Sequence, residues 1–185
     1  PCSSAASDVY KRQVYPYLHD RIHSKGQLAF LAACGVKTIL LSESSTTTFS
    51  YFSSYQYNAH AFTVELGKVR PFGQNDMRRF EDAKQAITQL ITQTEYAPTV
   101  EMGDLDIYRV NQVINRNEEQ FTLHFDDDTP NFTDYPKGTV LASEPGKEYI
   151  AEQDGEAIVF PNAKVAIGQR ALLTVVPTTL DKLDV

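Results

Sequence analysis

The sequence has 185 residues, of which 42% are hydrophobic, and a formal net charge of −7. This is the composition of a globular protein with one or two hydrophobic cores. The acidic balance argues against nucleic acid or an anionic membrane as the main partner, and no apolar run approaches the ~20 residues that span a bilayer.

The first residues form a polar segment. Residues 3–13 read SSAASDVYKRQ, which matches the in-frame translation of a transposase adapter used to prepare DNA sequencing libraries. We therefore interpret residues 1–13 as a scar that is not native, and we expect it to pack against nothing. On this interpretation the reading frame is cut at its 5′ end. The alternative is a natural polar N-terminus.

Two histidines stand four residues apart in HDRIH, residues 19–23. That spacing can hold zinc on a helix, but Asp20 stands where a metalloprotease helix carries glutamate. We therefore favour an exposed amphipathic helix. Without the leading segment Cys34 is the only cysteine. We expect it to be a small core residue, and the absence of an intrachain disulfide fits a reducing compartment.

Helical and strand-like segments alternate over the first half of the chain. We expect helices at residues 27–34, 49–57 and from Asn75 or Asp76 to about 94, with strands at 36–41 and 61–66. Gly35 and Asn58 suit the ends of the first two helices. This order predicts an α/β layer with a mainly parallel sheet over residues 14–97.

The pattern changes near residue 98. The stretch YAPTVEMGD, residues 96–104, carries a proline and a glycine and is typical of a boundary. After it come short alternating segments separated by turn residues: DIYRVNQVI, QFTLHF, GTVLA, EYIAE, EAIVF and ALLTVV. They predict a separate β-rich domain over residues 98–185.

The strand at residues 61–66 contains a glutamate near its end. A period of two puts Phe62 and Val64 on one face and Glu65 on the other. A lone carboxylate inside a covered sheet costs several kcal/mol, whereas the carboxyl end of a strand faces the ligand crevice of open α/β sheets. Glu65 is therefore a candidate acid/base. The alternative, a structural ion pair with Lys68 or Arg70, stays open.

Cations cluster after this strand. Lys68, Arg70, Arg78 and Arg79 form a basic patch in an acidic protein, and such groups suit carboxylate ligands. For Arg78 and Arg79 we favour a solvated helix face.

Several separated motifs carry a resemblance. VELGKVRPFGQND, with TTTFSYFS before it and NFTDYPKGTVLA and IVFPNAKVAIGQRALL after it, closely resembles the succinylglutamate desuccinylase family. That family lies in the aspartoacylase branch of the zinc-carboxypeptidase-like hydrolases. The resemblance implies the C-terminal part of an α/β/α catalytic domain followed by a small β-rich domain. It also implies a cytoplasmic enzyme of arginine catabolism that hydrolyses N-succinyl-L-glutamate to succinate and L-glutamate.

The resemblance also implies roles for single residues. Glu65 falls on the family's catalytic glutamate, the general base on a zinc-bound water and then the acid toward the leaving amine. Lys68, Arg70 and, from the β-rich domain, Arg170 are expected to contact substrate carboxylates. The loop at residues 43–47 departs from the family's glycine-rich pattern.

The family's zinc ligands, an early His-x-x-Glu motif and a later histidine, match nothing in this sequence. The resemblance therefore implies Zn²⁺ in the full-length enzyme, no metal ligand in this chain, and no activity for the chain alone. A related aspartoacylase or acyl-amino-acid deacylase is the nearest alternative. A non-enzymatic binding module, with Glu65 only ion-paired, is the alternative of a different class.

Overall fold

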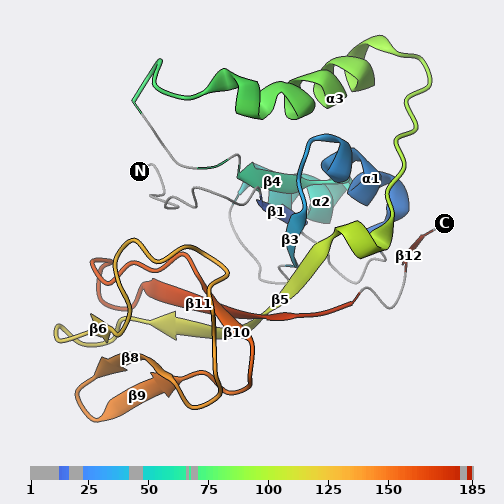
Figure 1. Cartoon of the computed structure of the whole chain (residues 1–185). Helices are drawn as coiled ribbons and strands as arrows, with labels where there is room; N and C mark the ends of the chain where they lie inside the picture. The colour runs from blue at the N-terminus through green and yellow to red at the C-terminus, as the bar shows by residue number, and fades with distance from the viewer. Residues whose placement is uncertain are drawn as a thin grey trace. The chain divides into compact units, whose positions relative to one another are not determined.

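The computed structural model describes residues 13–16, 23–41, 48–65, 67, 71–179 and 183–184. The chain forms two compact units (Figure 1). Residues 11–108 and 178–185 form the first, called here the α/β unit, and residues 109–177 belong to the second, called the β unit. The predicted boundary at residue 98 stays a prediction.

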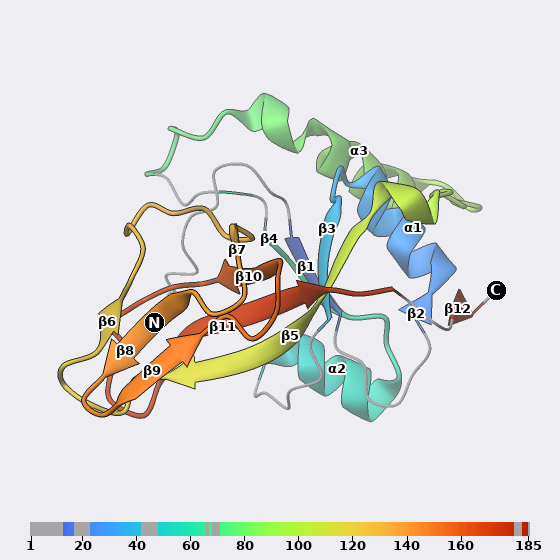
Figure 2. The same cartoon turned by 60° about the horizontal axis from the view of Figure 1, so that its bottom comes forward.

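The α/β unit is a small sheet with helices on both faces. Its elements are β1 (Gln13–Pro16), β2 (His23–Ser24), α1 (Lys25–Ala33), β3 (Thr38–Leu41), α2 (Phe49–Tyr57), β4 (Phe62–Glu65), the 3₁₀ helix η1 (Met77–Phe80), α3 (Glu81–Thr92), the 3₁₀ helix η2 (Met102–Asp104) and β12 (Leu183–Asp184). The strand order is β4-β1-β3, followed by the start of β5. Figure 2 shows α1 and α3 on one side of these strands and α2 on the other. Among the described residues, no helix is both long and apolar enough to span a membrane.

The first two helices confirm the expected helix ends. The chain leaves α1 through Gly35 at φ 74°, and its N–H donates to Ala32 O at 2.8 Å. Thr48 caps α2 by accepting from the Tyr51 N–H at 3.3 Å, and Asn58 ends it in the left-handed region at φ 60°. These ends form where the sequence places them because capping depends on neighbouring residues alone.

The third helix begins differently from the prediction. Residues 77–80 form η1, and the α-helix starts only at Glu81. Asp76 caps η1 by accepting from the Arg78 N–H at 3.2 Å, and its other oxygen bonds the Arg78 guanidinium at 2.9 Å. The Asp76 carboxylate thus binds both the backbone N–H and the guanidinium of Arg78, two positions later. These two contacts hold the first turn in the tighter 3₁₀ form.

The prediction of a mainly parallel sheet is wrong. β1 lies between β3 and β4, parallel to β3 but antiparallel to β4, so the sheet is mixed. The strand at residues 13–16 was not predicted, because four residues ending in proline carry no clear alternation. Its first residue, Gln13, is paired with Thr38 and Glu65, which contradicts the expected lack of contacts at that residue. Residues 1–12 lie outside the described residues.

The prediction of a helix over HDRIH is also wrong at its last residue, His23. His23 lies in the two-residue strand β2, which pairs in parallel with β12. A long-range partner therefore sets the conformation here, and the local spacing of the histidines does not. Residues 17–22, with His19, lie outside the described residues.

The β unit confirms the expected β-rich domain, and its described residues contain no helix. Its strands are β5 (Asp106–Asn115), β6 (Thr122–Leu123), β7 (Asp134–Tyr135), β8 (Val140–Glu144), β9 (Lys147–Ile150), β10 (Glu156–Val159) and β11 (Arg170–Pro177). β5, which begins in the α/β unit, continues here in the order β5-β11-β10-β7, and β6-β8-β9 form a second sheet.

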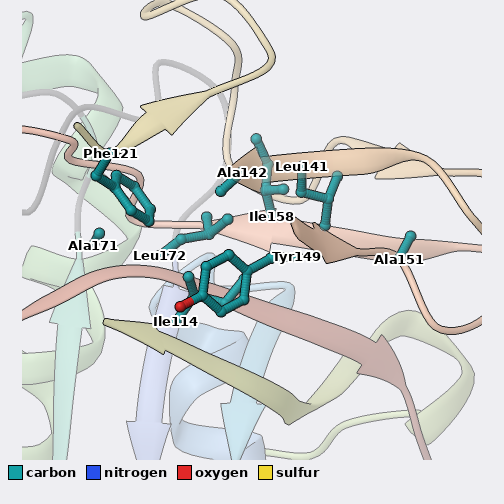
Figure 3. Packing of buried hydrophobic residues seen from close by; sticks show 9 residues of the cluster. All are labelled: Ile114, Phe121, Leu141, Ala142, Tyr149, Ala151, Ile158, Ala171 and Leu172. Atoms are coloured by element: carbon teal, nitrogen blue, oxygen red, sulfur yellow. The ribbon is translucent and has the colours of Figure 1, made fainter. Parts of the chain in front are cut away.

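The β unit has a hydrophobic core of buried side chains. Figure 3 shows its side chains converging from several strands: Ile114, Phe121, Leu141, Ala142, Tyr149, Ala151, Ile158, Ala171 and Leu172. The aromatic rings of Phe121 and Tyr149 lie 6.3 Å apart, a distance suited to a tilted aromatic pair.

The end of the chain leaves this domain. The Thr178 N–H donates to Ile107 O at 2.8 Å, and β12 then pairs with β2. Residues 178–185 therefore group with the α/β unit, although the sequence pattern had placed them in the β-rich domain.

Candidate functional site

Glu65 is the last residue of β4. Its register partner across the antiparallel pair is Gln13 of β1. Gly67, two residues later, has φ 108°, a conformation that side chains rarely adopt. The glycine therefore lets the chain bend just after the carboxylate.

The two faces of β4 have different surroundings. Phe62 and Val64 pack against a buried cluster of α1, α3 and the segment between α1 and β3, made up of Leu31, Cys34, Val36, Ala83 and Ala86. Because side chains alternate along a strand, Glu65 lies on the opposite face. Helix α2 lies on that side of the strands and contacts β4 (Figure 2). Phe62 and Val64 share one face as predicted, and Cys34 is a buried core residue as predicted.

The surroundings of Glu65 favour its neutral form. The residue is half-buried, and burial raises the pKa of its carboxyl group above the ordinary glutamate value. Among the described residues, none forms a hydrogen bond or ion pair with this side chain. A carboxyl group whose pKa is raised by burial alone is a candidate proton acceptor, because a base works best when its pKa approaches the working pH.

The predicted cations fall in different places. Lys68 and Arg70 lie outside the described residues and stay predictions. Arg170 is the exposed first residue of β11, in the β unit. Its guanidinium lies 5.8 Å from the centre of the Phe160 ring, a cation–π contact that leaves the charge facing water.

Phe160 was missed in the sequence. It has φ 55°, which is unusual for an aromatic residue. Its N–H donates to Asn131 Oδ1 at 2.8 Å, and this bond holds the backbone in place. The one available signal was VFPN, where a proline follows the residue.

The residues described by the structure contain no group of three or more His, Cys, Asp or Glu side chains that could hold a metal. A catalytic zinc site needs three protein ligands. The described part of this chain therefore does not fit a complete zinc site, and no chemical step can be assigned to a metal from its residues.

Two carboxylates in the β unit were also missed. Glu144 accepts from the Asn117 N–H at 3.0 Å and from the Tyr149 hydroxyl at 2.7 Å. The hydrogen bonds from Asn117 and Tyr149 lower the pKa of Glu144 to about 2. These hydrogen bonds tie the turn after β5 to the hairpin of β8 and β9.

Glu156 is fully buried. Its oxygens accept from Gln112 Nε2 at 2.7 Å and the Glu152 N–H at 2.6 Å, as well as from Asn111 and the Thr174 hydroxyl. Burial raises its pKa, but these hydrogen bonds outweigh burial, so the net pKa is lowered. A charged group with this many donors is a satisfied core group.

Comparison with protein families matches two adjacent domains. A model described as the succinylglutamate desuccinylase/aspartoacylase catalytic domain matches residues 2–91. A second, the AstE/AspA barrel-sandwich hybrid domain, matches residues 103–178. The first match begins inside the segment interpreted as a scar, and the origin of residues 1–13 stays a prediction.

Named relatives are similar over most of this chain. It is 60% identical to a succinylglutamate desuccinylase of Pseudoalteromonas atlantica over 92% of its own length and 49% of the relative. Identity to that of Idiomarina loihiensis is 51%, over 94% of this chain and 51% of the relative. The chain therefore spans about half the length of these curated relatives.

Solved structures give the same result. The succinylglutamate desuccinylase of Vibrio cholerae superposes with a TM-score of 0.83 at 33% identity, over 98% of this chain and 54% of that one. The enzyme of Chromobacterium violaceum superposes with a TM-score of 0.81 at 35% identity, over 95% and 52%. The α/β unit and the β unit thus have counterparts in crystal structures.

Proposed function

Because this chain belongs to the succinylglutamate desuccinylase/aspartoacylase family, we propose that it forms part of an enzyme that hydrolyses N-succinyl-L-glutamate. Water adds across the amide bond, so that the products are succinate and L-glutamate. The proposal places the reaction in arginine catabolism in the cytoplasm.

Glu65 is the residue that supports this chemistry. It stands at the end of β4, half-buried, with a pKa raised by burial. We propose that it takes a proton from the attacking water and then gives it to the nitrogen of the leaving glutamate. A positioned base of this kind contributes typically 10²–10⁴-fold to the rate.

The substrate carries three carboxylates, and cations should contact them. Lys68 and Arg70 follow the catalytic strand within a few residues, and bidentate binding favours arginine. Arg170 presents an exposed guanidinium against Phe160. We propose these three as substrate contacts.

Zinc is part of the proposal for the whole enzyme, where it would activate the water. Its ligands are expected outside this chain. We therefore expect the chain alone not to hydrolyse the substrate.

The test uses this chain joined to the part of the Pseudoalteromonas atlantica relative that it does not match. Glu65→Gln keeps the shape of the side chain and removes the proton acceptor. Zinc content and folding should remain near the parent values, while kcat/KM for N-succinyl-L-glutamate should fall by at least ~10², or roughly 2.7 kcal/mol. If Glu65→Gln retained most of the activity, the assignment would be wrong. If it unfolded the protein, the ion-pair alternative would be favoured.

A deacylase of the aspartoacylase type is the second candidate, because the matching family description names both activities. The joined protein separates them. We expect kcat/KM for N-succinyl-L-glutamate to exceed that for N-acetyl-L-aspartate, and the reverse order would reassign the substrate.

A further inference from the structure

Two aromatic residues of the β unit have an unusual backbone conformation. The structure describes all of residues 109–177, and within them Phe132 and Phe160 have φ angles of 64° and 55°. The other positive-φ positions of this range are glycines, at residues 138, 146, 155 and 168. A bulky side chain is strained in this conformation, and such strain persists only where the surrounding structure holds it, often at functional sites.

Core packing accounts for Phe132 but not for Phe160. Phe132 is 5% exposed, so its side chain belongs to the interior. Phe160 is only half-buried, although it follows directly after the four buried residues of β10. A contact at the surface gives a better reason for an aromatic ring here: the guanidinium of Arg170 lies over it, 5.8 Å from the ring centre.

A buried amide holds the backbone of Phe160 in place. The Phe132 N–H donates to Ile158 O at 2.7 Å, which brings the two stretches of chain side by side. The Phe160 N–H then donates at 2.8 Å to the side-chain oxygen Oδ1 of Asn131, where a regular strand pair would offer a backbone carbonyl. Asn131 is 4% exposed, so water competes little for this bond.

The segment that joins Phe160 to Arg170 is held as well. Nη1 of Arg116 donates to Val165 O at 2.8 Å, and the Gly168 N–H donates to Arg116 O at 2.7 Å. The side chain of Val165 packs against the hydrophobic core of the β unit. The ring and the guanidinium therefore belong to one well-anchored stretch of chain, which restricts the orientation in which the guanidinium is presented.

We propose that Phe160 is a positioning residue for Arg170. Asn131 fixes the strained backbone of Phe160, the face of the ring supports the guanidinium, and the exposed guanidinium receives a carboxylate of the acyl-amino-acid substrate. A guanidinium is planar and binds a carboxylate through two parallel hydrogen bonds, so fixing its plane beforehand reduces the entropy lost on binding. This inference rests on the proposed substrate contact of Arg170.

The kinetic test uses the joined protein. Phe160→Leu keeps the apolar bulk but removes the aromatic face. It should raise KM for N-succinyl-L-glutamate at least about fivefold and change kcat less than about twofold, because the supported contact holds substrate and transition state alike. Phe160→Tyr keeps the aromatic face and should rescue KM to within about twofold of the parent value. A fall in Tm and kcat at unchanged KM would show a structural role and overturn the proposal.

Phe125→Leu is the matched control. Phe125 is also half-buried in the β unit, but its ring faces the ring of Tyr135, with the centres 6.1 Å apart. The same loss of an aromatic ring should change KM here by less than about twofold. Equal increases in KM from Phe125→Leu and Phe160→Leu would contradict the assignment.

A double-mutant cycle measures whether Phe160 acts through Arg170. Arg170→Gln should raise KM at least about tenfold, and adding Phe160→Leu to it should raise KM further by less than about twofold. If Phe160→Leu has the same effect in both backgrounds, or if Arg170→Gln leaves KM unchanged, the proposal is wrong. Asn131→Leu removes the acceptor of the Phe160 N–H and should raise KM by about the same factor as Phe160→Leu; if this variant does not fold, the cycle decides.

A spectroscopic measurement on the joined protein separates this inference from the proposed activity. The ring current of Phe160 should move the NMR resonance of the Arg170 Hε proton upfield, and Phe160→Leu should abolish that displacement. Succinate, used as the carboxylate probe, should shift this resonance, with a Kd at least about fivefold higher in Phe160→Leu. A resonance that succinate leaves unchanged would overturn the positioning role even in an active protein. An inactive protein in which succinate shifts it as expected would count against the proposed activity alone.

Discussion

At the scale of single residues, the half-buried Glu65 and the buried Glu144 differ because their neighbours differ. Glu65 has no described hydrogen-bond donor, and burial raises its pKa. Glu144 has donors on both oxygens, and its pKa falls to about 2. The same side chain is therefore a candidate base in one unit and a structural anion in the other.

The low pKa of Glu144 predicts how stability depends on pH. A folded-state pKa below the ordinary glutamate value means that the stabilisation is present above pH 4.5 and is lost as the pH falls toward about 2. Glu144→Gln should lower Tm at pH 7 and flatten the decline in Tm between pH 4.5 and 2. Thermal unfolding followed by circular dichroism measures both. The control is Glu148→Gln, at an exposed residue of β9; a similar loss of Tm in this control would refute the argument.

At the scale of elements, α3 is held by little. Only Ala83 and Ala86 of this helix are buried, and they contact a cluster formed with α1. Two small side chains remove little apolar area from water, roughly 25 cal/mol per Å². We infer that α3 opens more readily than the strands do.

A charge in this contact should therefore release the helix. Ala86→Asp buries an unpaired carboxylate, which costs more than about 1.4 kcal/mol, so amide exchange in α3 should rise at least about tenfold. Gln85→Asp introduces the same group at the preceding exposed residue and should leave α3 nearly unchanged. Mass spectrometry of the exchanged peptides distinguishes them. Unchanged protection in Ala86→Asp would mean that other contacts hold the helix.

At the scale of the whole molecule, the two units differ in how fully their large apolar side chains are buried. The β unit has a closed core and two buried carboxylates with their hydrogen bonds satisfied. The α/β unit exposes most of the large apolar side chains that the structure describes as exposed. Hydrophobic burial dominates folding free energy, so the β unit should be the more stable part.

This difference is testable by expressing residues 103–178 alone. We expect this piece to unfold cooperatively, at a Tm within a few degrees of the upper transition of the whole chain. The whole chain should show a second, lower transition from the α/β unit. Differential scanning calorimetry separates the two, and an unfolded 103–178 piece or a single transition for the whole chain would contradict the prediction.

The sequence by itself determined the features that depend on near neighbours. Helix periods and caps placed α1 and α2, and Asn58 adopts the left-handed conformation expected of a helix end. Alternation in β4 predicted that Phe62 and Val64 share one face, and the buried cluster on that face confirms it. These features are local, because capping and strand alternation involve residues only a few positions apart.

Tertiary structure alone decided which distant segments meet. The four residues of β1 form a strand because β3 and β4 pair with them on either side, which makes the sheet mixed. Glu144 and Glu156 became structural anions only when distant donors surrounded them. On α3 the helical period marks an apolar stripe, but contacts with the rest of the fold decide that Ala83 and Ala86 are buried and that Ile91 is exposed. Strand pairing, burial and pKa depend on contacts between residues far apart in the chain, and no local pattern encodes these contacts.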